Sequence, residues 1–251
     1  MTVLTAVVTG AGSGIGRAIA RALLTDGVAV TLAGRRHVPL QETATIDGTP
    51  HPLALVVEAD VTDPAHIERM MAAHVARHGR LDVLVNNAGV FGPVADVGEL
   101  DAADWDAVAA VNITGAVLCA GAAFRQMRAQ TPQGGRIIDN GSVSAQTPRP
   151  RSVAYTTSKH AIAGLTKSIE LDGRPFRITA TQLDIGNART GLVDALVGDG
   201  ALQADGSRRP EPTMDAGHVA ELVVRLCRLP LEVSVPQVTV TAAGMPFIGR
   251  G

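Results

Sequence analysis

Short runs of apolar, β-branched residues alternate along the chain with segments whose apolar residues recur at helical spacing. The apolar runs lie at residues 3–8, 28–33, 53–58, 81–85, 135–139, 176–183 and 237–241. Strands that alternate with helices favour βαβ units and a parallel sheet. The run at 81–85 is apolar throughout, as expected of a strand covered on both faces. We therefore predict an α/β fold, a doubly wound parallel sheet of about seven strands with helices on both faces.

Length and composition favour one globular domain. The 251 residues are 46% hydrophobic and contain no evident linker, so we expect a single domain over 1–251. The net charge of -2 offers no electrostatic footprint for nucleic acid or for an anionic membrane. The N-terminus lacks the charged start of a signal peptide, and the apolar stretch at 107–124 is interrupted by polar residues. These features predict a cytoplasmic protein whose two cysteines are buried free thiols.

A glycine-rich turn follows the first predicted strand and opens the first predicted helix. Its glycines allow a tight turn and the close approach of a pyrophosphate, while the helix N-terminus presents free N–H groups to the phosphates. The strand–turn–helix context that a nucleotide site requires is therefore present. We predict dinucleotide binding at Gly10, Gly12, Ser13, Gly14, Ile15 and Gly16.

The second predicted strand is followed by Arg35 and Arg36 rather than by an acidic residue. Dinucleotide folds usually hold the ribose 2′-hydroxyl of NAD with a carboxylate at this place. Two guanidinium groups suit a 2′-phosphate instead, because the forked donors of arginine match phosphate oxygens. We expect NADP(H) to be favoured over NAD(H). An exposed basic loop is the alternative interpretation of the pair.

Tyr155, the only tyrosine, stands four residues before Lys159, one of only two lysines. Residues i and i+4 share one face of a helix. A cation beside a phenol favours the phenolate and lowers its pKa from about 10. Such a tyrosine can act as general acid or base for a carbonyl or an alcohol. Taken alone, the pair is also explained by an aromatic side chain packed beside a solvated lysine.

Taken in order, these motifs make the chain similar to the short-chain dehydrogenases/reductases, a family with a Rossmann-type fold. The run from Thr9 to Gly16 resembles the family's TGxxxGxG pattern, and the sequence after the fourth strand resembles its NNAG element. Tyr155 and Lys159 match its YxxxK, and Ser142 precedes Tyr155 by a spacing typical of the family. The resemblance implies hydride transfer between NADP(H) and a small-molecule ketone or secondary alcohol.

The resemblance also implies roles for individual residues. Tyr155 is expected to protonate the carbonyl oxygen and to act as base in reverse. Lys159 is expected to bind the nicotinamide ribose and lower the pKa of Tyr155, and Ser142 to donate to the substrate oxygen. Asn112 is expected to hold a water that joins Lys159 to solvent. Without the resemblance, Ser142 would be a turn residue and Asn112 a polar helix residue. The implied cofactor contacts add Asp60, Val61, Asn87, Ala88, Gly89, Gly186 and Thr190 to Tyr155 and Lys159.

The segment after the sixth predicted strand departs from the family. Ile185 stands where the family usually has proline before Gly186, and Asp184 and Asn187 add unusual polarity near the expected pocket. Residues 187–213 correspond to the family's substrate lid, and a loop of that length is usually functional or disordered. Four apolar residues are expected to close over the substrate: Leu192, Val193, Leu196 and Val197.

We expect no metal site. One predicted helix carries His66, His74 and His78, of which His74 and His78 stand four residues apart. Two ligands without a carboxylate or a third histidine make a weak case for zinc, so a solvated face is favoured.

The resemblance implies a homotetramer or homodimer built on the two long helices. A row of small residues would suit close packing between subunits: Gly115, Ala116, Cys119, Ala120 and Ala123. Two further hypotheses stand beside the NADP-linked enzyme. One is an NAD-linked alcohol dehydrogenase of the same family, and the other is a non-catalytic, nucleotide-binding regulatory protein.

Overall fold

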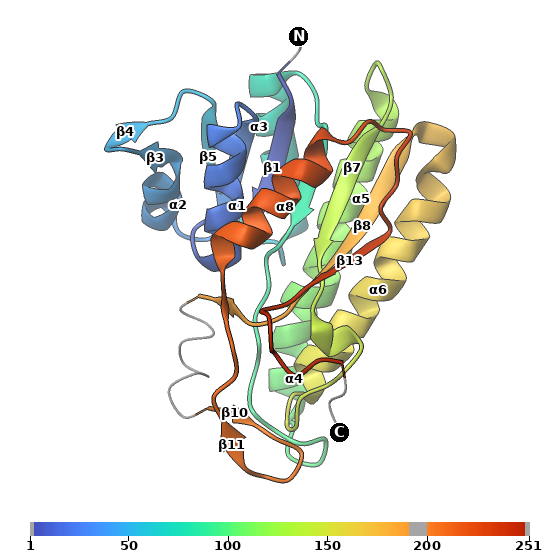
Figure 1. Ribbon diagram of the computed structural model, residues 1–251. Helices are drawn as coiled ribbons and strands as arrows, with labels where there is room; N and C mark the ends of the chain where they lie inside the picture. Colours follow the sequence, from blue (N-terminus) through green and yellow to red (C-terminus); the bar gives the residue numbers. More distant parts are fainter. Residues whose placement is uncertain (1–2, 191–199, 249–251) are drawn as a thin grey trace.

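The computed structural model describes residues 3–190 and 200–248. Its main sheet contains seven parallel strands in the order β13-β8-β7-β6-β1-β2-β5 (Figure 1). This order confirms the predicted doubly wound sheet. The strands are β1 (Thr5–Thr9), β2 (Ala29–Gly34), β5 (Ala54–Glu58), β6 (Val83–Asn86), β7 (Gly135–Asn140), β8 (Ile178–Ile185) and β13 (Gln237–Val240).

Helices cover both faces of the sheet. The helices α1 (Gly14–Thr25), α2 (His37–Ala44) and α8 (Ala216–Arg228) pack on one face, and α3 (Pro64–His78), α5 (Ala116–Ala129) and α6 (Val153–Gly173) pack on the other. Successive strand side chains point to opposite faces, so Ala6 and Val8 enter the first core and Val7 the second. Pro39 stands near the start of α2, which is short as expected.

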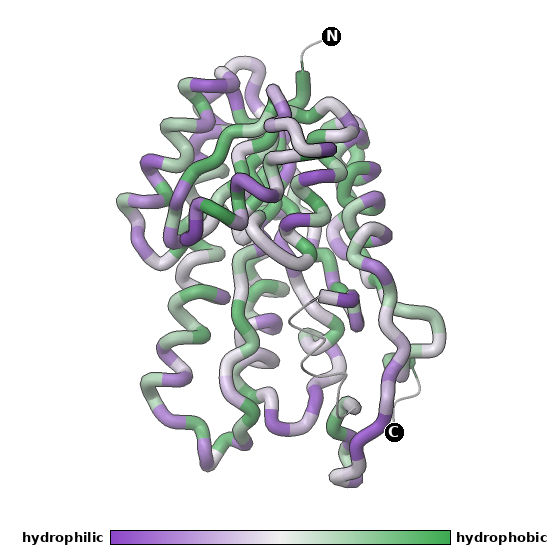
Figure 2. The backbone as a smooth tube through the Cα atoms, turned by 90° about the vertical axis from the view of Figure 1, so that its left-hand side faces the viewer, coloured by the Kyte–Doolittle hydropathy of each residue, from purple (hydrophilic) through white to green (hydrophobic). Residues whose placement is uncertain are grey.

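Each helix presents one apolar face to its core. Hydrophobic and hydrophilic residues alternate turn by turn along the helices (Figure 2). In α1, for example, Ile19 and Leu23 are fully buried, whereas Arg21 faces solvent. The periodicity seen in the sequence therefore corresponds to burial against the sheet.

A continuous helix over 102–129 joins α4 (Ala102–Ala109), a π-helical turn η1 (Ala110–Gly115) and α5. It is the one helix, within the described residues, that is long and apolar enough to cross a membrane. Part of its apolar surface packs in this chain's own core, where Cys119 and Met127 are fully buried.

This packing corrects the prediction for the row of small residues. Cys119, Ala120 and Ala123 are at most 1% exposed and face the sheet, so they cannot form a surface for packing between subunits. The prediction of two buried free cysteines, Cys119 and Cys227, is confirmed.

Short strand pairs occur within the expected lid at 187–213 and directly after it. The strand β9 (Ala188–Arg189) pairs with β12 (Met214–Asp215), and β10 (Ala201–Leu202) pairs with β11 (Arg208–Arg209). Leu192, Val193, Leu196 and Val197 lie outside the described residues. The remaining elements are the hairpin β3 (Thr45–Ile46) with β4 (Thr49–Pro50) and the one-turn helices η2 (Val143–Ala145) and η3 (Arg174–Phe176).

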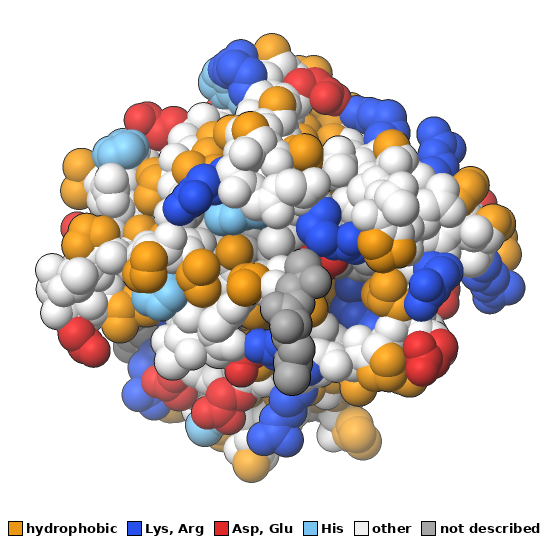
Figure 3. Space-filling model, turned by 90° about the horizontal axis from the view of Figure 1, so that it is seen from above, with side chains coloured by type: hydrophobic (Ala, Val, Ile, Leu, Met, Phe, Trp, Pro, Cys, Tyr) orange, Lys and Arg blue, Asp and Glu red, His pale blue; other side chains and the backbone are white. Residues whose placement is uncertain are grey.

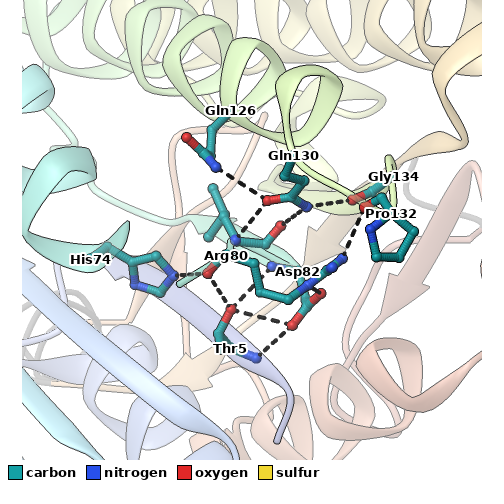
Figure 4. Close-up of polar contacts among 9 residues, drawn as sticks. Thr5, His74, Arg80, Asp82, Gln126, Gln130, Pro132 and Gly134 are labelled. Carbon is teal, nitrogen blue, oxygen red and sulfur yellow. Dashed lines mark hydrogen bonds and ion pairs between the residues drawn. The ribbon is translucent and has the colours of Figure 1, made fainter. Parts of the chain in front are cut away.

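A polar network ties the strands together at the edge where they begin (Figure 4). Thr5 donates from its backbone N to Asp82 (3.0 Å), and Asp82 accepts from Arg80 (2.6 Å). His74 of α3 contacts the carbonyl oxygen of Arg80 through Nε2 (2.9 Å) and the hydroxyl of Thr31 through Nδ1 (2.8 Å). His74 is fully buried, so the prediction of a solvated histidine face is wrong for this residue.

The surface above this edge is mixed in character. Positive, negative and apolar side chains are interspersed on it (Figure 3). No group of three or more potential metal ligands occurs among the residues that the structure describes.

Candidate active site

The candidate site lies where the strands end, at the lower end of the sheet in Figure 1. There β1 and β6 are neighbours, while the chain continues from them to opposite halves of the sheet. Parallel α/β sheets bind ligands at this kind of switch point. Asn87 and Ala88, just after β6, donate their backbone N–H groups to the Thr9 hydroxyl (2.9 and 3.0 Å), and the Asn87 side chain donates to the Thr9 carbonyl oxygen (2.9 Å). These bonds join the glycine turn to the segment that starts at Asn86.

The glycine turn adopts a shape that only glycine tolerates. Gly10 and Gly14 have φ values of 65° and 52°, and a Cβ at Gly16 would lie 2.3 Å from the Gly10 carbonyl oxygen. Ser13 precedes α1 without a side-chain capping bond, and the first turn contains no acidic residue. The first N–H groups of α1 and its positive dipole end therefore suit a phosphate, so the turn fits a dinucleotide.

Arg35 and Arg36 are exposed directly after β2. Two acidic residues lie near them. Glu58, which the sequence did not single out, is in register with Gly34 at the end of β5, and its carboxylate lies 3.3 Å from His37. The pKa of Asp60 is lowered, chiefly by the Thr62 backbone N–H and further by the charge of Arg35. The register of β5 beside β2, rather than a local motif, brings these carboxylates to the arginines.

Tyr155 and Lys159 share one face of α6, as predicted, with Lys159 buried and Tyr155 half-buried. The Lys159 ammonium donates to the Asn140 carbonyl oxygen (2.7 Å) and lies 5.5 Å from the centroid of the Tyr155 ring. Phe91 packs against the Tyr155 ring, with 4.4 Å between the centroids of the two rings. Phe91 was not singled out in the sequence, because it belongs to no motif.

The pKa of Tyr155 moves opposite to the expectation. Burial raises it to about 12, while a hydrogen bond with Ser142 and the charge of Arg149 lower it and the charge of Asp184 raises it. The prediction that the Lys159 ammonium makes this phenol acidic is therefore wrong for the structure described here, because desolvation dominates. Burial also lowers the pKa of Lys159 to about 8, against the charges of Asp139 and Asp184.

Ser142 lies beside the phenol at the start of η2. Its hydroxyl is hydrogen-bonded to Tyr155 and accepts from the backbone N–H of Ser144 (3.1 Å). The structure thus brings Ser142 to Tyr155, while Ser144 stabilises the turn through its backbone N–H. The backbone N–H of Ser142 donates to the carboxylate of Asp184 (3.1 Å).

Asn112 lies in the π-helical turn η1 and bonds outside its own helix. Its side-chain oxygen accepts from the Val90 N–H (2.8 Å), and its side-chain nitrogen donates to the Val90 carbonyl (2.8 Å) and to the Ser158 hydroxyl (3.0 Å). Ser158 in turn donates to the Tyr155 carbonyl oxygen (2.7 Å). Asn112 therefore connects the segment after β6 to the helix that carries Tyr155. Turns of π-helix are frequent at functional sites.

Other predicted cofactor residues are placed around this centre. Thr190 is next to the glycine turn, since a Cβ on Gly14 would lie 3.4 Å from its side chain. Val61 is buried and packs against Gly115, while Gly186 lies against Met245.

A cluster of charged and polar side chains around Glu211 was missed in the sequence, and the charge of its member Arg149 acts on the pKa of Tyr155. Glu211, just before α8, accepts from Arg149 (2.6 Å), from Asn187 (2.8 Å) and from Gln203 (3.2 Å). Burial opposes the charge of Glu211, yet these three hydrogen bonds and the Arg149 charge lower its pKa to about 2. The cluster joins three segments that are distant in sequence, so no spacing in the chain indicated it.

Comparison with known proteins gives consistent matches. The chain matches a family model described as short chain dehydrogenase over residues 4–199. It is 36% identical to the cis-4-hydroxycyclohexanecarboxylate dehydrogenase of Sinomonas cyclohexanicum over 77% of each protein. It is 33% identical to an uncharacterized oxidoreductase of Staphylococcus epidermidis over 94% of this chain and 95% of the relative.

Solved structures of similar fold hold nicotinamide cofactors. An alcohol dehydrogenase from the archaeon Thermococcus sibiricus, complexed with 5-hydroxy-NADP, matches with a TM-score of 0.78 and 26% identity over 95% of this chain and 96% of that one. A 3-ketoacyl-(acyl-carrier-protein) reductase from Brucella melitensis, complexed with NADH, matches with a TM-score of 0.82 and 23% identity over 94% of this chain and 96% of that one.

Proposed function

The chain belongs to the short-chain dehydrogenase/reductase family, and from this premise we propose that it transfers a hydride between NADP(H) and a ketone or secondary alcohol. The observation that carries the proposal is the grouping of half-buried Tyr155 with buried Lys159 and Ser142, in which the ammonium lies 5.5 Å from the phenol ring and a hydrogen bond with Ser142 lowers the pKa of the phenol. Similar proteins complexed with NADH and an NADP analogue support a nicotinamide cofactor.

The proposed chemistry follows from the protonation of these groups. Bound nicotinamide would supply the hydride in reduction and accept it in oxidation. Ser142 would donate to the substrate oxygen, and Tyr155 would deliver its phenolic proton to the same oxygen. Because the pKa of Tyr155 is raised to about 12, the phenol keeps its proton at neutral pH, which suits proton donation to a ketone. Asn112 would hold a water that resupplies the proton through Lys159.

We propose the cofactor contacts from the glycine turn outward. The turn at Gly10, Gly12, Ser13, Gly14, Ile15 and Gly16 would hold the pyrophosphate, and Arg35 and Arg36 the 2′-phosphate. Asp60 and Val61 would contact the adenine. The segment Asn87, Ala88 and Gly89, together with Tyr155, Lys159, Gly186 and Thr190, would hold the nicotinamide end.

An NAD-linked alcohol dehydrogenase is the second candidate. The observation that favours it is Glu58, which β-sheet register places at the edge where the ribose hydroxyls would lie. A non-catalytic, nucleotide-binding regulatory protein is the third, and the absence of turnover with a panel of ketones would support it. We also propose a cytoplasmic protein.

The acid–base role is tested with Tyr155→Phe. The variant keeps the ring that packs on Phe91 but loses the hydroxyl, so kcat for ketone reduction should fall by at least about 100-fold. The dissociation constant for NADPH should stay within about threefold of the wild-type value, because hydride transfer and cofactor binding use different groups. Steady-state kinetics with cyclic and open-chain ketones measure kcat. Fluorescence titration with NADPH measures the dissociation constant.

A matched control separates proton transfer from packing. Phe91→Leu removes the ring beside Tyr155 and leaves the hydroxyl, so its loss of kcat should be much smaller than that of Tyr155→Phe. Wild-type turnover in Tyr155→Phe would refute the assigned role.

A further inference from the structure

Behind the Ser142 turn lies a fully buried carboxylate that the proposed chemistry does not use. Asp184 of β8 has no exposed surface. Its Oδ1 accepts from the Ser142 N–H (3.1 Å) and the Gln182 side chain (2.7 Å). Its Oδ2 accepts from the side chains of Gln146 (2.9 Å) and Gln237 (2.7 Å). Four donors therefore surround the carboxylate, and all of them are neutral.

This surrounding favours a charged carboxylate. Four N–H groups point at its two oxygens, so a protonated carboxyl would direct an O–H towards donors. Hydrogen bonds to the charged form stabilise that form in a buried place. No salt bridge to Asp184 occurs within the described part of the chain. The negative charge is thus held by dipoles rather than cancelled by a cation.

The carboxylate bonds both ends of the turn that presents Ser142. Ser142 precedes η2 and Gln146 follows it, and each donates to a different oxygen of Asp184. The turn approaches the Asp184 carboxylate closely at Gly141. A Cβ on Gly141 would lie 2.3 Å from Oδ1 of Asp184, so residue 141 must be glycine for this contact. The Gly141 N–H also bonds the Leu183 carbonyl oxygen (2.9 Å), which fixes the turn against β8.

We propose that Asp184 is a positioning residue of the active site, whose buried carboxylate holds both ends of the Ser142 turn and places a fixed negative charge behind Tyr155 and Lys159. This proposal rests on the proposed function for its effect on turnover. The charge acts on Tyr155 together with Arg149, and on Lys159 together with Asp139. Its sign follows from electrostatics: it disfavours the phenolate and favours the ammonium.

The effect of this charge can be measured at single residues, because the chain contains one tyrosine and two lysines. In a Lys167→Arg background, which changes an exposed residue, a ¹³Cε lysine label gives one signal from Lys159. A ¹³Cζ tyrosine label gives one signal from Tyr155. Both titrations are read by NMR on the whole chain and need no substrate.

Asp184→Asn keeps the shape of the side chain and removes its charge. We expect the Lys159 midpoint to move below its starting value near 8. We also expect more phenolate at a fixed alkaline pH at which both proteins stay folded. The matched variant Asp139→Asn removes the other buried carboxylate that acts on Lys159. It should move the Lys159 signal and leave the Tyr155 signal nearly unchanged. Unmoved signals in Asp184→Asn, or equal effects of both variants on Tyr155, would overturn the proposal.

A second variant tests whether Asp184 positions the turn that carries Ser142. It also serves if Asp184→Asn does not fold. Gln146→Leu removes one donor at the end of η2 and keeps the charge. Because a small displacement of a catalytic group slows the reaction strongly, kcat should fall about 10-fold with an unchanged NADPH dissociation constant. Gln133→Leu, at an exposed glutamine far from the site, should keep the wild-type kcat. Equal kcat in both glutamine variants would contradict the positioning role.

The two proposals fail in distinguishable ways. A wild-type protein that binds NADPH and reduces no ketone, while both NMR signals shift in Asp184→Asn, would refute the enzyme function and leave the placement of the charge standing. Ketone turnover with neither signal shifted would refute the role of Asp184 alone.

Discussion

Under the proposed function, Arg35 and Arg36 are the two side chains that select the cofactor. Both are exposed after β2, where their charges remain available to an anion. Glu58 and Asp60 lie at the same edge, and Arg35 already interacts with Asp60. A 2′-phosphate brings negative charge and several acceptor oxygens to the arginines, whereas a ribose hydroxyl suits a carboxylate. Under the proposed function, the two guanidinium groups favour the phosphate.

We expect Arg35→Ala/Arg36→Ala to raise KM for NADPH by about 10- to 100-fold, because each lost charge-assisted contact weakens phosphate binding by about 1 kcal/mol or more. KM for NADH should change far less, since NADH has no 2′-phosphate. Steady-state kinetics with both cofactors measure the ratio. Arg225→Ala, at an exposed arginine on α8, should leave the ratio intact. A wild-type preference for NADH would contradict NADP(H) specificity.

The helix α3 illustrates how one buried side chain can couple an element to pH. His74 bonds Thr31 and the Arg80 carbonyl through its two ring nitrogens. Burial, and then the charge of His78, lowers its pKa to about 4. A carbonyl only accepts, so Nε2 carries the proton and Nδ1 accepts from the Thr31 hydroxyl. The neutral ring thus joins α3 to β2 and to the start of β6.

This pairing predicts a loss of stability in acid. In the unfolded chain a histidine binds a proton near pH 6.5, whereas folded His74 stays neutral down to about pH 4. The contribution of His74 is therefore complete above about pH 6.5 and declines by about 3 kcal/mol as the pH falls to about 4. Urea unfolding across this range should show a shallower pH dependence in His74→Gln than in the wild type. His218→Gln, at an exposed site, should keep the wild-type slope, and an identical slope in His74→Gln would contradict the assignment.

At the scale of the whole molecule, the surface residues of the two long helices bear on assembly. The row of small residues is used inside the chain, but Val117 on α5 and Leu171 on α6 are 44% and 60% exposed. Apolar side chains exposed on adjacent long helices are consistent with the family's mode of assembly. We therefore propose a homotetramer.

Light scattering should give a mass of four times the 25.9 kDa chain. Val117→Arg/Leu171→Arg should reduce that mass, because charges placed in an apolar interface lose their hydration. Val38→Arg is the matched control, since Val38 is 67% exposed on α2, away from both helices. A monomeric wild type, or an unchanged mass in the Val117 and Leu171 variant, would contradict the assembly.

Much of the fold was predictable because its signals are local. The period of apolar residues determines which segments become strands or helices, and the glycine turn identifies where the first strand meets the first helix. The parallel direction of the strands then follows from βαβ connections. The pairing of Tyr155 with Lys159 was also predictable, since a spacing of four residues sets their common face on any helix.

The sequence by itself thus determined the main strands and helices, the parallel direction of the sheet and the presence of a phenol beside an ammonium. Only the tertiary structure decided that burial raises the pKa of Tyr155, that Asn112 bonds Val90 and Ser158, and that Asp184 lies behind Ser142. The physical reason is the range of the interactions. Helix and strand periodicity depend on neighbours along the chain, whereas desolvation and Coulomb interactions depend on distances in space between segments that the sequence keeps far apart.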